Sequence, residues 1–205
     1  MAMRPLLEQL EPRLLLNAVP VFIVKVEAPS PVDISADVPA YLWTEGCGPT
    51  AAAMVLGYHD AEHIDLIQGD SSTQTAEVQG AIAELAVAMQ TDARGWTRWA
   101  KIDNGTEAYA LSRGVVVDAR MLGWGAITID NLKVELANGR PAVLLVDSDG
   151  NGSSDHFVTV VAVDTHYEKY GCFDTYTRTM KWKPWRQLGN GAYSVYGAMT
   201  VEVIG

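Results

Sequence analysis

The sequence predicts an α+β protein in which an N-terminal helical part packs on a C-terminal antiparallel sheet. Segments with helical spacing or helix-forming composition come early, at residues 47–58, 75–90 and 105–112. Strand-like runs rich in β-branched residues dominate after residue 142. Helices that precede strands in this way are typical of α+β folds, since strict alternation would instead indicate a parallel sheet. The length of 205 residues fits one domain with a sizeable core.

Composition and charge exclude several classes of protein. Hydrophobic residues make up 48% and charged residues 20% of the chain, which is ordinary for a globular protein. The net charge of −10 argues against nucleic acid as a partner, because nucleic-acid binders present a basic face. No apolar run reaches the roughly 18–20 residues that cross a bilayer, so we expect no transmembrane segment. We also expect no cofactor.

Residues 1–20 are predicted to be an export-associated tail, and residues 21–205 to be the folded domain. The tail lacks the long apolar stretch of a secretory signal peptide. Residues 10–18, Leu-Glu-Pro-Arg-Leu-Leu-Leu-Asn-Ala, resemble a short Leu-Glu-Pro-Arg-x-Leu-Leu segment found near the N-termini of exported or surface proteins, notably in planctomycete-type bacteria. This resemblance implies an exported or envelope-associated protein. The alternative is an amphipathic arm that packs on the domain.

The remaining elements follow from local signals along the chain. Residues 21–26 are predicted to form a strand, and the proline-rich residues 28–39 an extended connection. Thr75 is the expected N-cap of the second helix, whose apolar residues fall on one face. Gly139 marks a helix end. The other predicted elements are a loop at residues 60–75, a short strand at 115–117, a helix at 128–138, and strands at 142–146, 157–163, 170–175 and 194–203.

Cys47 lies between two glycines and is followed by Pro49 and a run of strong helix formers up to Gly57. Proline is favoured at the start of a helix, where its missing N–H costs nothing. Cys47 is therefore expected at or just before a helix N-terminus, where free N–H groups and the helix dipole favour an anion. A thiol placed there has its pKa lowered towards neutrality, which suits a nucleophile. The alternative is a buried structural cysteine.

A histidine and an aspartate downstream supply what a nucleophilic cysteine needs, namely a base and a group that orients the base. His156 opens an apolar, β-branched run, which predicts a strand with an imidazole at its start. Asp174 lies in the next strand-like segment, after a hairpin-sized connection at residues 165–169. The two arms of this hairpin are nearly equal in length, so Asp174 is expected beside His156 in an antiparallel pair.

The segments around these three residues resemble the papain-like cysteine peptidases of family thirty-nine, relatives of the leader-cleaving domain of bacteriocin exporters. The resemblance spans residues 38–203 and rests on Gly-Cys-Gly-Pro-Thr-Ala-Ala-Ala-Met at residues 46–54, Asp-His-Phe-Val at residues 155–158, and Asp174. It implies a papain-like fold with the nucleophile helix packed on the sheet. It also implies that Cys47 is the nucleophile, His156 the general base and acid, and Asp174 the residue that orients His156.

The sequence departs from this family before the cysteine. Family members usually carry a glutamine about six residues upstream, which donates a hydrogen bond to the oxyanion, and here that position is Tyr41. Loss of one oxyanion donor typically costs about 10²–10³-fold in rate. Either the Tyr41 hydroxyl replaces it, or the backbone N–H of Cys47 acts with another group, or the domain is weak or inactive. We favour Tyr41 and Trp43 as aromatic walls of a cleft.

Two polar constellations raise the question of a metal ion, and we expect none. His59 and His63 have the spacing of zinc ligands on a helix, but the helix is expected to end near Gly57 and no third ligand is obvious, which favours solvated loop histidines. His166 is expected at the surface of the hairpin turn. The second constellation partly matches a calcium loop but lacks its bidentate glutamate, which favours a tight turn. Its oxygen-bearing side chains belong to Asp147, Asp149, Asn151 and Asp155.

Cys172 is the second cysteine, and two cysteines are too few for a disulfide scaffold. Because Cys172 precedes Asp174 by two positions, a regular strand would place both on one sheet face and bring Cys172 near the site. A Cys47–Cys172 disulfide would abolish nucleophilic chemistry and is the direct rival of an enzymatic role. We favour two free thiols.

Together these features favour a cysteine peptidase that cleaves a peptide or protein substrate through an acyl-enzyme on Cys47. One alternative is a weak or inactive papain-like surface binding module, which the missing glutamine favours. Another is an acyl transferase, in which an amine replaces water. No feature of the sequence indicates an oligomeric state. Five tryptophans either line a groove or pack elsewhere: Trp96, Trp99, Trp124, Trp182 and Trp185.

Overall fold

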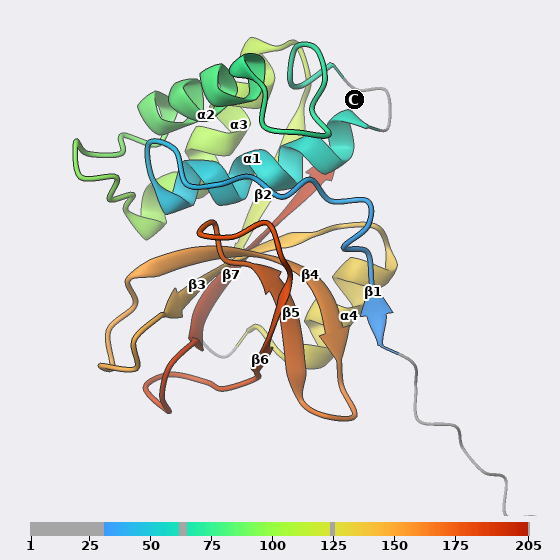
Figure 1. Ribbon diagram of the computed structural model, residues 1–205, viewed down its shortest axis with the longest axis vertical. Helices are drawn as coiled ribbons and strands as arrows, with labels where there is room; N and C mark the ends of the chain where they lie inside the picture. Colours follow the sequence, from blue (N-terminus) through green and yellow to red (C-terminus); the bar gives the residue numbers. More distant parts are fainter. Residues whose placement is uncertain (1–30, 62–64, 124–125, 205) are drawn as a thin grey trace, which may run out of the picture.

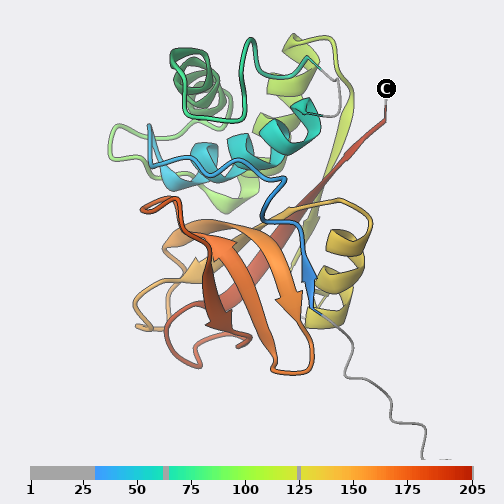
Figure 2. The same ribbon diagram turned by 45° about the vertical axis from the view of Figure 1, so that its right-hand side comes forward.

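A layer of helices lies against an antiparallel sheet, as the sequence predicts (Figure 1). The computed structural model describes residues 31–61, 65–123 and 126–204, so the predicted tail and the strand at residues 21–26 lie outside the described residues. The helical layer holds α1 (Cys47–Asp60), α2 (Ala76–Ala88), a 3₁₀ turn (Trp99–Lys101) and α3 (Ile102–Ser112). A fourth helix, α4 (Ile129–Ala137), packs beside the sheet, away from this layer (Figure 2).

The strands follow the order β2-β7-β3-β4-β5-β6, and each neighbouring pair is antiparallel. A further short strand, β1, pairs with β4 outside this order. This arrangement confirms the α+β class and the antiparallel sheet. The bounds are β1 (Val32–Asp33), β2 (Val117–Leu122), β3 (Ala142–Asp147), β4 (His156–Asp164), β5 (Lys169–Phe173), β6 (Lys181–Pro184) and β7 (Ser194–Val203).

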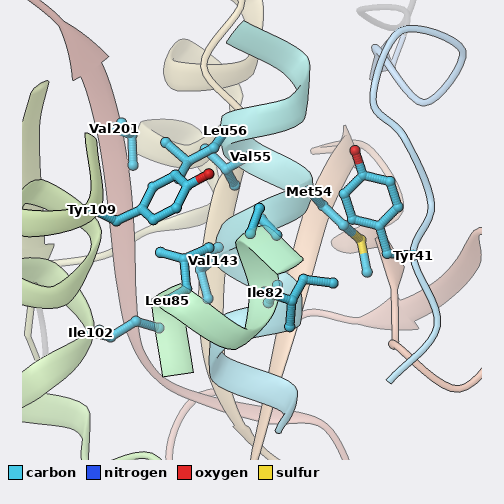
Figure 3. Close-up of a cluster of buried hydrophobic side chains, with 14 of the residues drawn as sticks. Tyr41, Met54, Val55, Leu56, Ile82, Leu85, Ile102, Tyr109, Val143 and Val201 are labelled. Carbon is cyan, nitrogen blue, oxygen red and sulfur yellow. The ribbon is translucent and has the colours of Figure 1, made fainter. Parts of the chain in front are cut away.

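α1 is the central helix, because its residues are buried all round rather than along one stripe. Small side chains bring it close to the sheet, where the hydroxyl of Thr159 on β4 donates to the carbonyl of Ala51 at 3.0 Å. Larger side chains from the same helix fill the core that it shares with α2 and α3 (Figure 3). Gly57 was predicted to end this helix, but α1 continues to Asp60. A Cβ there would lie 2.6 Å from the Tyr41 hydroxyl, so glycine serves close packing.

Most element boundaries match the predictions. Thr75 caps α2, since its hydroxyl accepts the N–H of Val78 at 3.3 Å, and Thr128 caps α4 in the same way. The strand predicted at residues 115–117 is placed too early, because β2 begins at Val117 and its pairing with β7 continues through polar residues such as Asp118 and Arg120. β6 was not predicted at all. It is an edge strand that carries lysines and ends at a proline, features that block pairing with other chains and hide the strand signal.

The sheet is covered on both faces, so neighbouring residues of one strand belong to different apolar clusters. Phe157 and Phe173 face the helical layer, whereas Val158 and Cys172 lie in the cluster that α4 covers. The sheet therefore separates Cys172 from Cys47, and the expectation that Cys172 lies near the site is wrong. Among the described helices, none is long and apolar enough to cross a membrane.

Candidate active site

Cys47 is the first residue of α1, and glycines on both sides let a loop pack against this helix tip. Gly46 has φ +142°, and a Cβ there would lie 2.6 Å from the carbonyl oxygen of Gly95. A Cβ on Gly48 would lie 2.8 Å from the hydroxyl of Thr97. Glycine is needed at both positions because the loop at residues 91–98 leaves no space for a side chain.

The loop at residues 91–98 is held by the carboxylate of Asp92, and we call it the cleft loop. Asp92 Oδ1 accepts the N–H groups of Arg94 and Trp96 at 2.9 and 3.0 Å. The hydroxyls of Thr91 and Thr97 share a hydrogen bond of 2.7 Å at the base of the loop. These bonds present the Trp96 side chain, which is 51% exposed, beside Cys47.

His156 is the first residue of β4, and its imidazole is fixed by two contacts. Its Nε2 lies 2.9 Å from the carbonyl oxygen of Asp174. Since a carbonyl oxygen only accepts hydrogen bonds, Nε2 carries the proton of the neutral ring and Nδ1 keeps its lone pair. The ring of Tyr176 stacks on the imidazole, with 4.8 Å between centroids and 6° between planes. His156 is thereby held in the form that can accept a proton at Nδ1.

Asp174 contacts His156 through its main chain, whereas its carboxylate has other partners. The carboxylate accepts from Lys181 Nζ at 2.5 Å and from the N–H groups of Tyr176 and Thr177 at 3.2 and 3.1 Å. Burial alone would raise the pKa of this carboxyl, but these donors hold the pKa below its usual value. The predicted neighbourhood of His156 and Asp174 is present, and the contact comes from the carbonyl oxygen.

Burial sets the charge state of the two reactive groups. It raises the pKa of the Cys47 thiol and outweighs the N–H groups of Phe157 and Gly48, which lower it. The N–H groups at the helix tip lower this pKa, as predicted, but burial outweighs them, so the predicted net shift towards neutrality is wrong. Burial also lowers the pKa of His156, against the effects of the Asp174 carbonyl and the charge of Asp155. The raised pKa of Cys47 and the lowered pKa of His156 both favour an uncharged thiol beside an uncharged imidazole.

Two cavities meet at Cys47. The larger, of about 460 Å³, is lined by both Cys47 and His156, which places the predicted nucleophile and base on one surface. The smaller, of about 260 Å³, also has Cys47 in its lining, lacks His156 and is mostly apolar. Trp96 and Asp155 line both cavities. Trp43, which is 47% exposed, lines the larger one, so its expected place in a cleft wall is confirmed.

Tyr41 lies far from Cys47 and takes no part in the cleft. Its ring is fully buried beside Met54 (Figure 3), and its hydroxyl donates to the carbonyl oxygen of Ser71. The hydroxyl packs on Gly57, which at a rise of about 1.5 Å per residue is about 15 Å along α1 from Cys47. Tyr41 is therefore neither an oxyanion donor nor a cleft wall, because its side chain is buried in the hydrophobic core.

No glutamine or asparagine side chain lines either cavity in the described part of the chain. Gln74, which no sequence pattern indicates, instead holds the segment before Cys47. Its Nε2 donates to the Leu42 carbonyl at 2.9 Å, and its Oε1 accepts the Leu42 N–H at 2.8 Å. The donors beside the thiol are main-chain N–H groups: that of Phe157, and those of Cys47 and Gly48, which have no partner inside the helix.

The remaining histidine predictions have mixed outcomes. His59 is buried within α1, so its expected place in a solvated loop is wrong. His63 lies outside the described residues. His166 is exposed in the β4–β5 turn, as predicted.

Residues 147–155, which partly match a calcium loop, form a turn whose carboxylates accept hydrogen bonds from main-chain N–H groups of the same turn. Asp147 accepts the N–H groups of Gly150, Asn151 and Gly152 at 2.7, 3.1 and 2.7 Å, and Asp155 accepts the N–H of Ser148 at 2.7 Å. Within residues 31–61, 65–123 and 126–204, no three His, Cys, Asp or Glu side chains are grouped to hold a metal ion. Cys47 and Cys172 are both free thiols.

A helix-tip cysteine and a strand histidine at one cleft, on this arrangement of helices and sheet, define the papain-like α+β class. The Peptidase_C39-like family matches residues 35–201, and the chain belongs to that family. No curated protein matches the sequence.

Two solved structures share the fold. Interpain A, a cysteine protease from Prevotella intermedia, is 11% identical with a TM-score of 0.56, covering 83% of this chain and 94% of its own. A C39-like peptidase from Bacillus anthracis is 14% identical with a TM-score of 0.51, covering 86% and 98%.

Proposed function

We propose that this chain is a cysteine peptidase with Cys47 as nucleophile and His156 as general base and acid. The observation that carries the proposal is that both side chains line one cavity, while Nε2 of His156 is committed to the Asp174 carbonyl. This leaves Nδ1 to accept the thiol proton. Membership of a peptidase-like family supports a peptide or protein as the substrate.

The proposed reaction has two halves. In the first, the Cys47 proton moves to His156 Nδ1, sulfur attacks the peptide carbonyl, and the C–N bond breaks as Nδ1 returns the proton to the leaving amine. In the second, water gives a proton to Nδ1 and attacks the thioester, the C–S bond breaks to release the acid, and Nδ1 returns the proton to sulfur. The N–H groups at the start of α1 support the oxyanion. Asp174 positions His156 through its carbonyl oxygen.

Digestion of a proteome-derived peptide mixture, read by mass spectrometry, tests this proposal. New peptide termini are expected with the wild type and not with Cys47→Ser or His156→Ala. Cys172→Ala serves as the matched control and should retain activity, because Cys172 lies on the other side of the sheet. Equal numbers of new termini for the wild type and Cys47→Ser would overturn the proposal.

A second candidate function is a binding module with little or no turnover. Two observations favour it: burial raises the pKa of Cys47, and no amide side chain in the described residues lines the cleft to support an oxyanion. Peptides that bind equally well to the wild type and Cys47→Ala, without cleavage, would support this candidate. An acyl-enzyme that decays faster with added amines would instead indicate acyl transfer.

A further inference from the structure

We propose that the smaller cavity beside Cys47 binds one large apolar side chain of the substrate, on the acyl side of the scissile bond. The walls that make this selection are Trp99, Leu145 and Phe157. This inference rests on the proposed peptidase function and names the substrate preference of the same site.

The side of the scissile bond follows from the place of His156. A general acid must reach the amine that leaves, so the leaving group lies on the His156 side of Cys47. His156 lines the larger cavity and is absent from the lining of the smaller one. The smaller cavity therefore faces the part of the substrate that becomes the acyl group on Cys47.

Two of the cavity walls, Leu145 and Phe157, belong to a row of paired residues that crosses three strands. Leu145 on β3 is paired with Phe157 on β4 and with Gly197 on β7. Directly opposite residues share a sheet face, so all three are directed towards the helical layer. Leu145 and Phe157 supply side chains, and Gly197 supplies a space.

Trp99 occupies the space over Gly197. A Cβ on Gly197 would lie 2.7 Å from Cζ2 of the Trp99 ring. The same ring lies nearly parallel to that of Phe157, with 6.1 Å between centroids and 18° between planes. The glycine thus seats an indole against the sheet and leaves an apolar cavity open between Trp99 and Cys47.

The polar groups at the edge of the cavity are mostly engaged. The Thr97 hydroxyl bonds to Thr91, and the Asp155 carboxylate accepts from the N–H and hydroxyl of Ser148. Arg98 is exposed at the rim. A volume of about 260 Å³ is below the usual range for a drug-sized ligand, which suits a single side chain. These properties fit a residue such as Leu or Phe.

The test uses peptidyl acyloxymethyl ketones, which alkylate a cysteine without requiring turnover. Four probes carry Phe, Leu, Gly or Glu at the two positions before the reactive carbon, and intact-mass spectrometry gives the Cys47 labelling rate. The Phe and Leu probes should label at least about 10-fold faster than the Gly and Glu probes. Equal rates for all four, faster labelling by Glu, or rates no higher than with iodoacetamide would overturn the proposal.

Variants connect any preference to this cavity. Gly197→Ala should push Trp99 into the cavity and abolish the preference for Phe, and Trp99→Ala should weaken it by removing a wall. Gly80→Ala, on an open face of α2, and Trp182→Ala, on β6, are the matched controls and should keep the preference. An apolar preference that survives both Gly197→Ala and Trp99→Ala would place the selection elsewhere.

The outcomes separate this inference from the proposed function. Fast labelling by apolar probes without peptide cleavage would support the cavity and contradict the peptidase. Peptide cleavage without a preference for apolar probes would support the peptidase and contradict the proposed role of the cavity.

Discussion

The Tyr176 ring lies parallel to the His156 imidazole at 4.8 Å, although the Tyr176 side chain is 61% exposed. An exposed aromatic side chain held flat against a buried imidazole acts as a cover. It covers one face of the imidazole ring. Tyr176 was not predicted as a site residue, because it follows the end of β5 in an irregular segment.

Removal of this cover should change both activity and titration. Tyr176→Ala exposes His156, so the lowered pKa of the imidazole should rise towards its ordinary value. The acid limb of the pH profile should move to higher pH, with a loss of about 10-fold or less in kcat/KM. Tyr176→Phe keeps the ring and is the matched control. NMR titration of His156 in a Cys47→Ala background gives the pKa, and an impairment in Tyr176→Phe equal to that in Tyr176→Ala would contradict stacking as the cause.

Asp174 is expected to work through its backbone. Asp174→Asn retains the carbonyl that binds His156 and an oxygen that can accept from Tyr176 and Thr177. We expect kcat/KM within about 10-fold of wild type, whereas a carboxylate that orients the imidazole would cost about 10⁴-fold when changed to Asn. Asp174→Ala should be more impaired, because it releases the segment at residues 174–177. A near-complete loss in Asp174→Asn would restore the carboxylate to the orienting role.

The pH dependence of alkylation should reveal the resting state of Cys47. Its pKa is raised by burial, so the thiolate fraction at pH 7 is smaller than for an exposed cysteine, and labelling should climb above about pH 8.5. Cys172, whose pKa burial raises to about 12, should stay unlabelled in the folded protein. Iodoacetamide and mass spectrometry suffice. Fast labelling at pH 5–6 that His156→Ala abolishes would instead demonstrate a preformed ion pair.

Gly46→Ala should destabilise the protein and impair the site together. The added Cβ would meet the Gly95 carbonyl at 2.6 Å in a conformation with φ +142°, so the cleft loop or the helix tip must move. We expect a loss of about 1–3 kcal/mol in the free energy of unfolding. Gly80→Ala has open space and should gain about 0.5–1 kcal/mol. Urea unfolding measures both, and an unchanged midpoint in Gly46→Ala would contradict tight packing at the tip.

Asp147 should stabilise the fold only while it is charged. The N–H groups of Gly152, Gly150 and Asn151 hold its pKa below the ordinary value despite burial. A depressed pKa in the folded state contributes stability above the unfolded pKa, and that contribution is lost as the pH falls through the folded pKa. At pH 7 the melting temperature of Asp147→Asn should therefore be lower than that of the wild type. The difference between the two melting temperatures should shrink towards pH 2–3. A melting temperature that rises with added calcium would contradict the reading as a metal-independent turn.

The fold was predictable where local signals were strong. The run of helix formers after Pro49 defines α1, the Thr75 cap and one apolar face define α2, and β-branched runs define β3, β4 and β7. β6 was not predictable in this way, because its lysines and proline serve to protect an edge. The end of α1 was missed because Gly57 reflects a tertiary contact with Tyr41, which local sequence does not contain.

The sequence predicts which residues of the site lie close together, but not which of their atoms are in contact. The hairpin between β4 and β5 predicts that His156 and Asp174 lie together. Which atom of Asp174 makes the contact depends on the register, which shifts between Val160 and Ala162. Likewise, the direction of the Tyr41 side chain depends on core packing rather than on its distance from Cys47 along the chain. The roles of Cys47, His156 and Asp174 in catalysis stay predictions.

The sheet that separates the two cysteines has a consequence for the oxidation of Cys47. A cysteine oxidised to a sulfenic acid is commonly rescued when a nearby second thiol forms a disulfide with it. Cys172 belongs to the apolar cluster on the far face and cannot reach Cys47 without unfolding the sheet. An oxidised Cys47 would therefore be reduced again only by a reductant that enters the cleft from outside.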